Sequence, residues 1–193
     1  NLGSIFEARE QMDCALFYYH QSMRFNQQAN SELGIALCHG HFGRLYEKSG
    51  DLDSALIEYR HAYDISSSSN DVWHWLESCL SIARVNIAKG NLGIAANYLH
   101  KAEKAANEIN SLEHIAEAYR LEYLMSLKTG NINKALDYYI LSQQYSDSVN
   151  NEKNLVQMQN TRINYERELK KNEIGQMQKD LLIERAQRRT YAV

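Results

Sequence analysis

The chain has 193 residues, of which 44% are hydrophobic and 23% are charged, with a formal net charge of -3. This composition is typical of a folded domain with a substantial apolar core. The near-neutral balance excludes a strongly basic surface for nucleic acid, and no apolar run reaches the roughly 20 residues of a membrane-spanning helix. Three cysteines make an odd count, which excludes a disulfide framework, and we expect each to be a small buried side chain.

Apolar residues recur every three or four positions between short polar clusters, which predicts helices and no strands. The predicted helices cover residues 12–28, 31–48, 52–66, 71–89, 92–108, 111–128 and 132–148. The Asn150-Asn151 cluster then predicts a turn with helix-capping chemistry. Residues 152–190 contain one glycine and no loop cluster, so they are predicted to form one long helix.

The segment Gly50–Leu56 returns at residues 90–96 and again at residues 130–136, a period of 40 residues. Repetition at this length predicts an α-solenoid, in which each unit packs on its neighbours and a concave surface stays free for a partner. Residues 10–16 take the corresponding place in the frame. We therefore expect the chain to be a segment of a longer protein whose first repeat is truncated.

Small and bulky residues recur in register with this period. Gly3, Gly43 and Ala83 share one position of the first helix, and Tyr19, Tyr59, Leu99 and Tyr139 share one position of the second. Small residues against large ones allow antiparallel helices to interlock.

This pattern resembles the tetratricopeptide repeat, with a period of 40 and no closing proline. The residues that carry the resemblance are Gly43, Tyr46, Gly50-Asp51, Ala55, Tyr59 and Ala62. The resemblance implies an all-α right-handed superhelix over residues 1–150, in which the first helix of each pair lines the groove. Residues 151–193 are expected to form a capping helix, with Leu155, Met158, Tyr165 and Leu169 on the last repeat, that continues into a charged connecting helix. Its apolar residues Ile174, Met177, Leu181 and Leu182 predict a coiled-coil seam and a homodimer.

The end of the chain resembles a more particular family, the tetratricopeptide sensor domains of bacterial membrane-bound two-component regulators. The resemblance rests on Tyr139, Asp147-Ser148, residues 165–174 and residues 184–190. It implies an extracytoplasmic (periplasmic) domain of an inner-membrane protein, a membrane span outside this segment, and a histidine kinase or helix-turn-helix output. On this basis we expect a sensor that relays ligand binding through its last helix. The alternative is a cytosolic scaffold or peptide-responsive regulator without a membrane role.

Candidate binding residues follow from the same register. Arg44, Arg84, Leu124 and Asn164 share one position of the first helices, and Arg120 and Asn160 share another one turn earlier. These side chains are predicted to line the groove and to offer donors to a peptide or protein partner. Glu77 and Glu117 are close enough in sequence to pair with Arg84 or Arg120. The alternative is a set of solvated ion pairs.

Motifs for catalysis are missing from the sequence, which has no phosphate-binding glycine loop, H-E-x-x-H or nucleophile elbow. We therefore expect no catalysis and no cofactor in this segment. The run Cys38-His39-Gly40-His41 places Cys38 and His41 one turn apart, as a zinc site requires. It lacks a second ligand pair, so no metal site is predicted, and a metal- or thiol-dependent enzyme is the third alternative.

Overall fold

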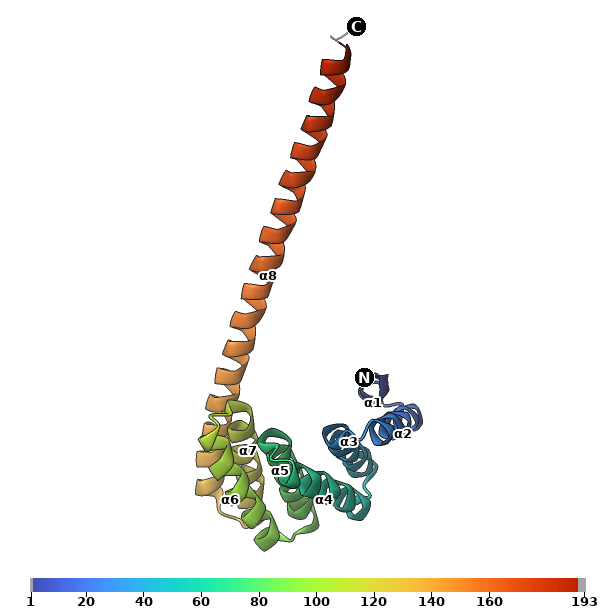
Figure 1. Ribbon diagram of the computed structural model, residues 1–193. Helices are drawn as coiled ribbons and strands as arrows, with labels where there is room; N and C mark the ends of the chain where they lie inside the picture. Colours follow the sequence, from blue (N-terminus) through green and yellow to red (C-terminus); the bar gives the residue numbers. More distant parts are fainter. Residues whose placement is uncertain (1, 191–193) are drawn as a thin grey trace. The chain divides into compact units, whose positions relative to one another are not determined.

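A computed structural model describes the backbone of residues 2–190 and the side chains of residues 2–178. Over the described backbone the protein is all-helical, which confirms the predicted fold class (Figure 1). The helices are α1 (Leu2–Ala8), α2 (Met12–Gln28), α3 (Glu32–Ser49), α4 (Leu52–Ser68), α5 (Val72–Lys89), α6 (Leu92–Glu108), α7 (Leu112–Lys128) and α8 (Ile132–Thr190). The chain divides into two compact units, Asn1–Ser146 and Asp147–Val193.

The turns of the first unit alternate between two chemistries. Gly50, Gly90 and Gly130 follow α3, α5 and α7 with φ of 85°, 82° and 73°, where glycine avoids the steric cost of a Cβ atom. Asparagines follow the even-numbered helices: Asn30, Asn70 and Asn110 have φ of 50°, 57° and 53°. The next helix then begins at a capping side chain in several repeats, since Ser31 and Asp71 accept hydrogen bonds from the backbone N–H groups of Gly34 and His74.

The core of the first unit is a run of small and large side chains in register. Tyr19 and Tyr59 are 0% and 3% exposed, and each ring lies directly on a glycine of the preceding helix. A Cβ atom on Gly3 or Gly43 would lie 2.6 or 2.7 Å from a ring carbon, which is too close for a real contact. Glycine at these positions is therefore required by the close approach of the ring.

The third helix pair packs a larger small residue against a smaller bulky residue at the same two positions. Ala83 stands at the glycine position and the smaller Leu99 at the tyrosine position, and both are buried in one apolar cluster. This exchange confirms the predicted small-against-large packing.

Three sequence predictions differ from the structure. The turn expected at Asn150-Asn151 is absent, because α8 runs as one helix through these residues. Cys14 is exposed, whereas Cys38 and Cys79 are buried as expected. The side chains predicted to cap the last repeat are exposed: Leu155, Met158, Tyr165 and Leu169 are 60%, 70%, 65% and 45% accessible. In the predicted coiled-coil seam, Ile174 and Met177 are exposed, and Leu181 and Leu182 lie outside the described side chains.

Candidate protein-binding groove

The odd-numbered helices form the inner layer of the first unit. α3 packs against α5, and α5 packs against α7, whereas no two even-numbered helices pack as extensively among the described residues. In a curved stack of helix pairs, the helices on the inside lie closer to their counterparts in the next pair than the helices on the outside do. This places α3, α5 and α7 along the inner surface, where the sequence predicted the groove.

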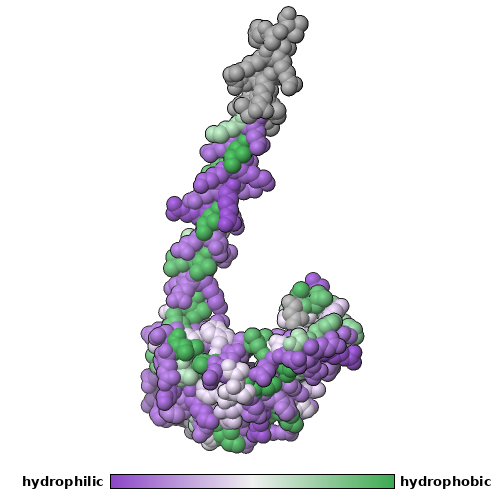
Figure 2. Space-filling view, viewed as in Figure 1, coloured by the Kyte–Doolittle hydropathy of each residue, from purple (hydrophilic) through white to green (hydrophobic). Residues whose placement is uncertain are grey.

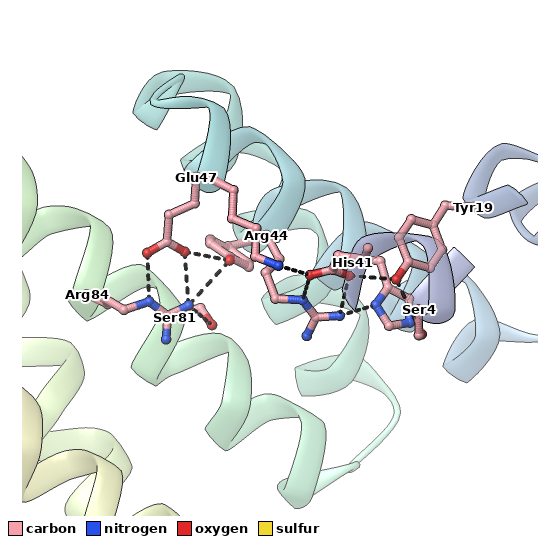
Figure 3. Close-up of polar contacts among 10 residues, drawn as sticks. Ser4, Tyr19, His41, Arg44, Glu47, Ser81 and Arg84 are labelled. Carbon is pink, nitrogen blue, oxygen red and sulfur yellow. Dashed lines mark hydrogen bonds and ion pairs between the residues drawn. The ribbon is translucent and has the colours of Figure 1, made fainter. Parts of the chain in front are cut away.

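A buried carboxylate joins the first three helices. Glu7 on α1 is 6% exposed. It accepts hydrogen bonds from Tyr19 Oη of α2 at 2.7 Å, Arg44 Nε of α3 at 2.9 Å and Lys48 Nζ of α3 at 2.8 Å. Arg44 also contacts His41 Nδ1, and the His41 ring stacks on Tyr19 with a centroid distance of 4.3 Å. We call Glu7, Tyr19, His41 and Arg44 the first clamp (Figure 3).

The first clamp holds fixed charge states. Burial raises the pKa of Glu7, but the hydrogen bonds from Lys48, Tyr19 and Arg44 together outweigh it and lower the pKa to about 2. Burial, followed by the positive charge of Arg44, lowers the pKa of His41 to about 4. At neutral pH the clamp therefore contains one carboxylate, one guanidinium and an uncharged imidazole whose Nδ1 accepts from Arg44.

The same arrangement returns 40 residues later between α3, α4 and α5. Tyr59 Oη donates to Glu47 at 2.8 Å, and Arg84 donates to the two oxygens of Glu47 at 2.7 and 3.0 Å. Ser81 accepts from Arg84 at 3.3 Å and stands where the first clamp has His41. Glu47, Tyr59, Ser81 and Arg84 form the second clamp, which Figure 3 shows beside the first.

All four polar positions become aliphatic in the third repeat. Ile87, Leu99, Leu121 and Leu124 take the places of the glutamate, tyrosine, histidine or serine, and arginine. Ile87, Leu99 and Leu121 are at most 3% exposed, and Leu124 packs against the same apolar cluster. We call these residues the aliphatic quartet.

A second layer of charge lies on α5 and α7. Glu117 accepts two hydrogen bonds from Arg120, at 2.6 and 2.7 Å, and lies 3.5 Å from Arg84 Nη1. The side chains of Glu117 and Arg120 are 29% and 44% exposed. This pair is therefore held in place by the second clamp and still reaches solvent, as a recognition site requires.

The structure distributes the predicted groove residues among different roles. Arg44 and Arg84 hold the carboxylates of the preceding repeat, Glu7 and Glu47. Arg120 and Glu117 pair with each other as predicted. Arg84 forms ion pairs with Glu47 and Glu117. Glu77 is exposed on α5, and its negative charge acts on His114 of α7.

Asn160 and Asn164 belong to the second unit. Both are exposed and line a shallow depression along one side of α8, together with Val156 and Thr161. They belong to a different compact unit of the chain from the arginine positions.

The cysteine–histidine motif has other partners. Cys38 Sγ lies 3.6 Å from Ser22 Oγ, and His39 Nδ1 lies 2.7 Å from a Glu58 oxygen. His41 belongs to the first clamp. The described residues include no group of three or more metal-ligating side chains in suitable positions.

Sequence reasoning missed both glutamates of the clamps. The signal was present, since Glu7 and Glu47 are 40 residues apart and each precedes its arginine by 37 residues. The spacing alone does not show that two helices from adjacent repeats bring these side chains together. Recognising the clamp requires the stacking of one repeat on the next.

The architecture and the repeated inner surface define a class of protein, the tetratricopeptide-like α-solenoid. Within that class, residues 7–148 match the family described as 26S proteasome subunit RPN7, and the chain belongs to this family. No protein of established annotation matches the chain in sequence.

Among the solved structures that share the fold, two show the extent of the likeness. Aspartyl phosphate phosphatase F from Bacillus subtilis superimposes with a TM-score of 0.70 at 18% identity, over 77% of this chain and 39% of that one. The apo form of RapI superimposes with a TM-score of 0.58 at 16% identity, over 77% of this chain and 67% of that one. This chain therefore spans about two fifths of the length of the phosphatase.

The predicted placement as a periplasmic domain of an inner-membrane sensor is wrong. Two of the solved structures that share the fold are an aspartyl phosphate phosphatase and RapI, and neither is described as a membrane-bound sensor. As a separate observation, none of the helices in the described part of the chain combines the length and apolar character needed to cross a membrane.

Proposed function

We propose that this chain is a non-catalytic helical-repeat module that binds a peptide segment or protein partner along the inner surface of α3, α5 and α7. The observation that carries the proposal is the Glu117–Arg120 pair, which is held by Arg84 and remains partly exposed. The guanidinium of Arg120, held in place on an inner surface, can donate hydrogen bonds to a carboxylate or to the carbonyl groups of an extended peptide.

The surroundings of this pair support peptide binding. Leu37 shares the repeat position of Glu77 and Glu117 on the inner helices and is 37% exposed, so apolar and charged groups stand at equivalent places along the surface. Membership in a family described as a proteasome subunit also favours protein binding, since a subunit acts through its contacts with other chains. The module therefore acts as a scaffold or as a peptide-responsive regulator.

The test uses peptides selected on the purified chain from a random 12-residue library, with affinity measured by fluorescence polarisation. We expect Arg120→Ala to weaken binding of the selected peptides by about tenfold, the usual effect of losing one charge-assisted contact. Lys104→Ala is the matched control, because Lys104 is an exposed cation on α6, outside the inner layer. Equal affinities for the two variants would contradict the proposed surface.

A further inference from the structure

The first unit ends in an uncovered apolar surface on α8. Tyr139 shares the repeat position of Tyr19, Tyr59 and Leu99, which are 0%, 3% and 1% exposed, yet Tyr139 is 46% exposed. Its neighbours along one face of the helix are Ile132, Leu136 and Ile140, which are 65%, 58% and 45% exposed. These four residues, which we call the end face, follow the i, i+4, i+7 and i+8 spacing of a single helical stripe, and none is charged.

Earlier repeats show what normally covers this position. Tyr19 is covered by α3, the first helix of the next pair, through the stacked His41 ring and the Arg44 side chain. Tyr59 is likewise within hydrogen-bond distance of Arg84 on α5. The natural occupant of the end face is therefore another helix with the pattern of α3, α5 and α7.

Residues 152–169 carry that pattern one period further on. Val156 aligns with Ala36 and Leu76, which are 3% and 0% exposed, and Tyr165 aligns with Leu45 and Val85, which are 7% and 0% exposed. Val156 and Tyr165 themselves are 56% and 65% exposed. Figure 2 shows the apolar residues of this part of α8 as separate green patches on a purple surface.

The sequence also contains the turn residue that would make this segment a separate helix. Asn150 aligns with Asn30, Asn70 and Asn110, all of which have positive φ, but in the structure it lies inside the unbroken helix Ile132–Thr190. Side chains of one continuous helix point away from a common axis and do not pack on one another. A chain in which α8 is unbroken therefore exposes both the end face and residues 152–169, which carry the pattern of a covering helix.

We propose that the end face of one copy is covered by residues 152–169 of a second copy, and that the exchange is reciprocal. Such an exchange is a domain-swapped homodimer, in which each chain completes the solenoid of the other. The 40-residue register places Thr161 of one copy against Tyr139 of the other, as His41 lies against Tyr19. The competing contact is the coiled-coil seam of Ile174 and Met177, further along the same helix.

The first experiment measures the mass of the full chain in solution by sedimentation over a range of concentrations. We expect a dimer, twice the 22.3 kDa of the chain. Leu136→Glu on the end face and Met158→Glu on the covering helix should each raise the dimer dissociation constant by about tenfold or more, because each places a charge in an apolar contact. All these positions are exposed in the single chain, and circular dichroism verifies that each variant keeps its helix content.

Two variants serve as controls for these substitutions. Ile57→Glu changes an apolar residue that is 55% exposed on α4, and Met177→Glu changes one that is 69% exposed in the seam. Neither should alter the dissociation constant. Dissociation by Met177→Glu but not by Met158→Glu would overturn the proposal in favour of the seam, and a wild-type chain that stays monomeric would overturn it as well.

The second experiment tests the exchange directly in a Cys14→Ser background, since Cys14 is exposed. One tagged copy carries Tyr139→Cys and a differently tagged copy carries Thr161→Cys, and the two are refolded together and oxidised. We expect a disulfide-linked heterodimer that carries both tags. A chain with both cysteines that forms the disulfide within a monomer would show instead that residues 152–169 turn back at Asn150, and would overturn the exchange.

Discussion

The second clamp and the aliphatic quartet occupy the same places in successive repeats and hold them together by opposite means. Between α3, α4 and α5 a carboxylate, a phenol, a hydroxyl and a guanidinium satisfy one another. Between α5, α6 and α7 four aliphatic side chains pack in one apolar cluster. The four positions change as a group, which is expected because a buried charge that loses its partner costs far more than a pair replaced as a whole.

The two junctions differ in what their contacts contribute: one favours stable packing, and the other favours a single arrangement of the helices. An aliphatic contact is strong and tolerant of small shifts, whereas a bidentate arginine–carboxylate pair fixes one angle between two helices. We therefore expect the clamps to fix the register of the first two junctions. The third junction is held by burial, and the adjacent Glu117–Arg120 pair remains partly exposed.

The largest effect is expected when one half of the second clamp is removed. Arg84→Leu leaves Glu47 without its bidentate partner, and we expect a loss of about 3 kcal/mol in the free energy of unfolding, measured with urea. Converting the whole set as Gly43→Ala, Glu47→Ile, Tyr59→Leu, Ser81→Leu and Arg84→Leu copies the third repeat. This variant should recover most of the loss, and one as unstable as Arg84→Leu alone would refute the equivalence of the two junctions.

The first clamp differs from the second in having a titratable histidine. His41 has a pKa of about 4 in the folded chain, below its ordinary value of 6.5, so the unfolded chain binds more protons between these pH values. Stability should therefore fall as the pH drops from 6.5 to 4, by on the order of 2 kcal/mol.

Replacement by the residue of the second clamp isolates this effect. His41→Ser should flatten the pH dependence of the urea midpoint in that window. His114, whose pKa is also lowered by burial, stays in both proteins, so the difference between the two curves reports His41. Parallel curves would mean that His41 is not held neutral by the clamp.

A smaller effect concerns the glycine under the tyrosine ring. Gly43→Ala places a Cβ atom 2.7 Å from Tyr59, and the required shift should cost about 1–2 kcal/mol despite the better helix propensity of alanine. Adding Tyr59→Leu removes the ring that clashes but also the hydroxyl that donates to Glu47, so the reference for the double variant is Tyr59→Leu alone. Gly43→Ala should cost less in that background than in the wild type. Gly40→Ala in the same helix meets no atom within 4 Å and should stabilise the chain by about 0.5–1 kcal/mol. Thermal unfolding of these variants tests the expected signs.

The helices and their packing were predictable because the responsible signals are local. The left-handed glycines at 50, 90 and 130 and the periodic apolar residues fix each helix pair within a few residues of its place in sequence. The clamps were not predictable in the same way, because Glu7 and Arg44 meet only when two repeats stack. α8 shows the converse limit, since the turn chemistry at Asn150 matches three real turns and yet the helix continues through it.

The smallest effect is expected for Lys48, which donates to Glu7 in addition to the residues of the first clamp. Lys48 donates to Glu7 at 2.8 Å with a side chain that is 43% exposed, and the second clamp has Ala88 at the same position. Glu7 keeps Tyr19 and Arg44 when Lys48 is removed, and the ammonium end of Lys48 is half-exposed, so solvent screens this contact more than the two that remain. Lys48→Ala should therefore cost about 0.5 kcal/mol at low salt and less at high salt, by urea unfolding. A loss as large as that of Arg84→Leu would mean that the two clamps are not equivalent, because the first would then depend on a cation that the second lacks.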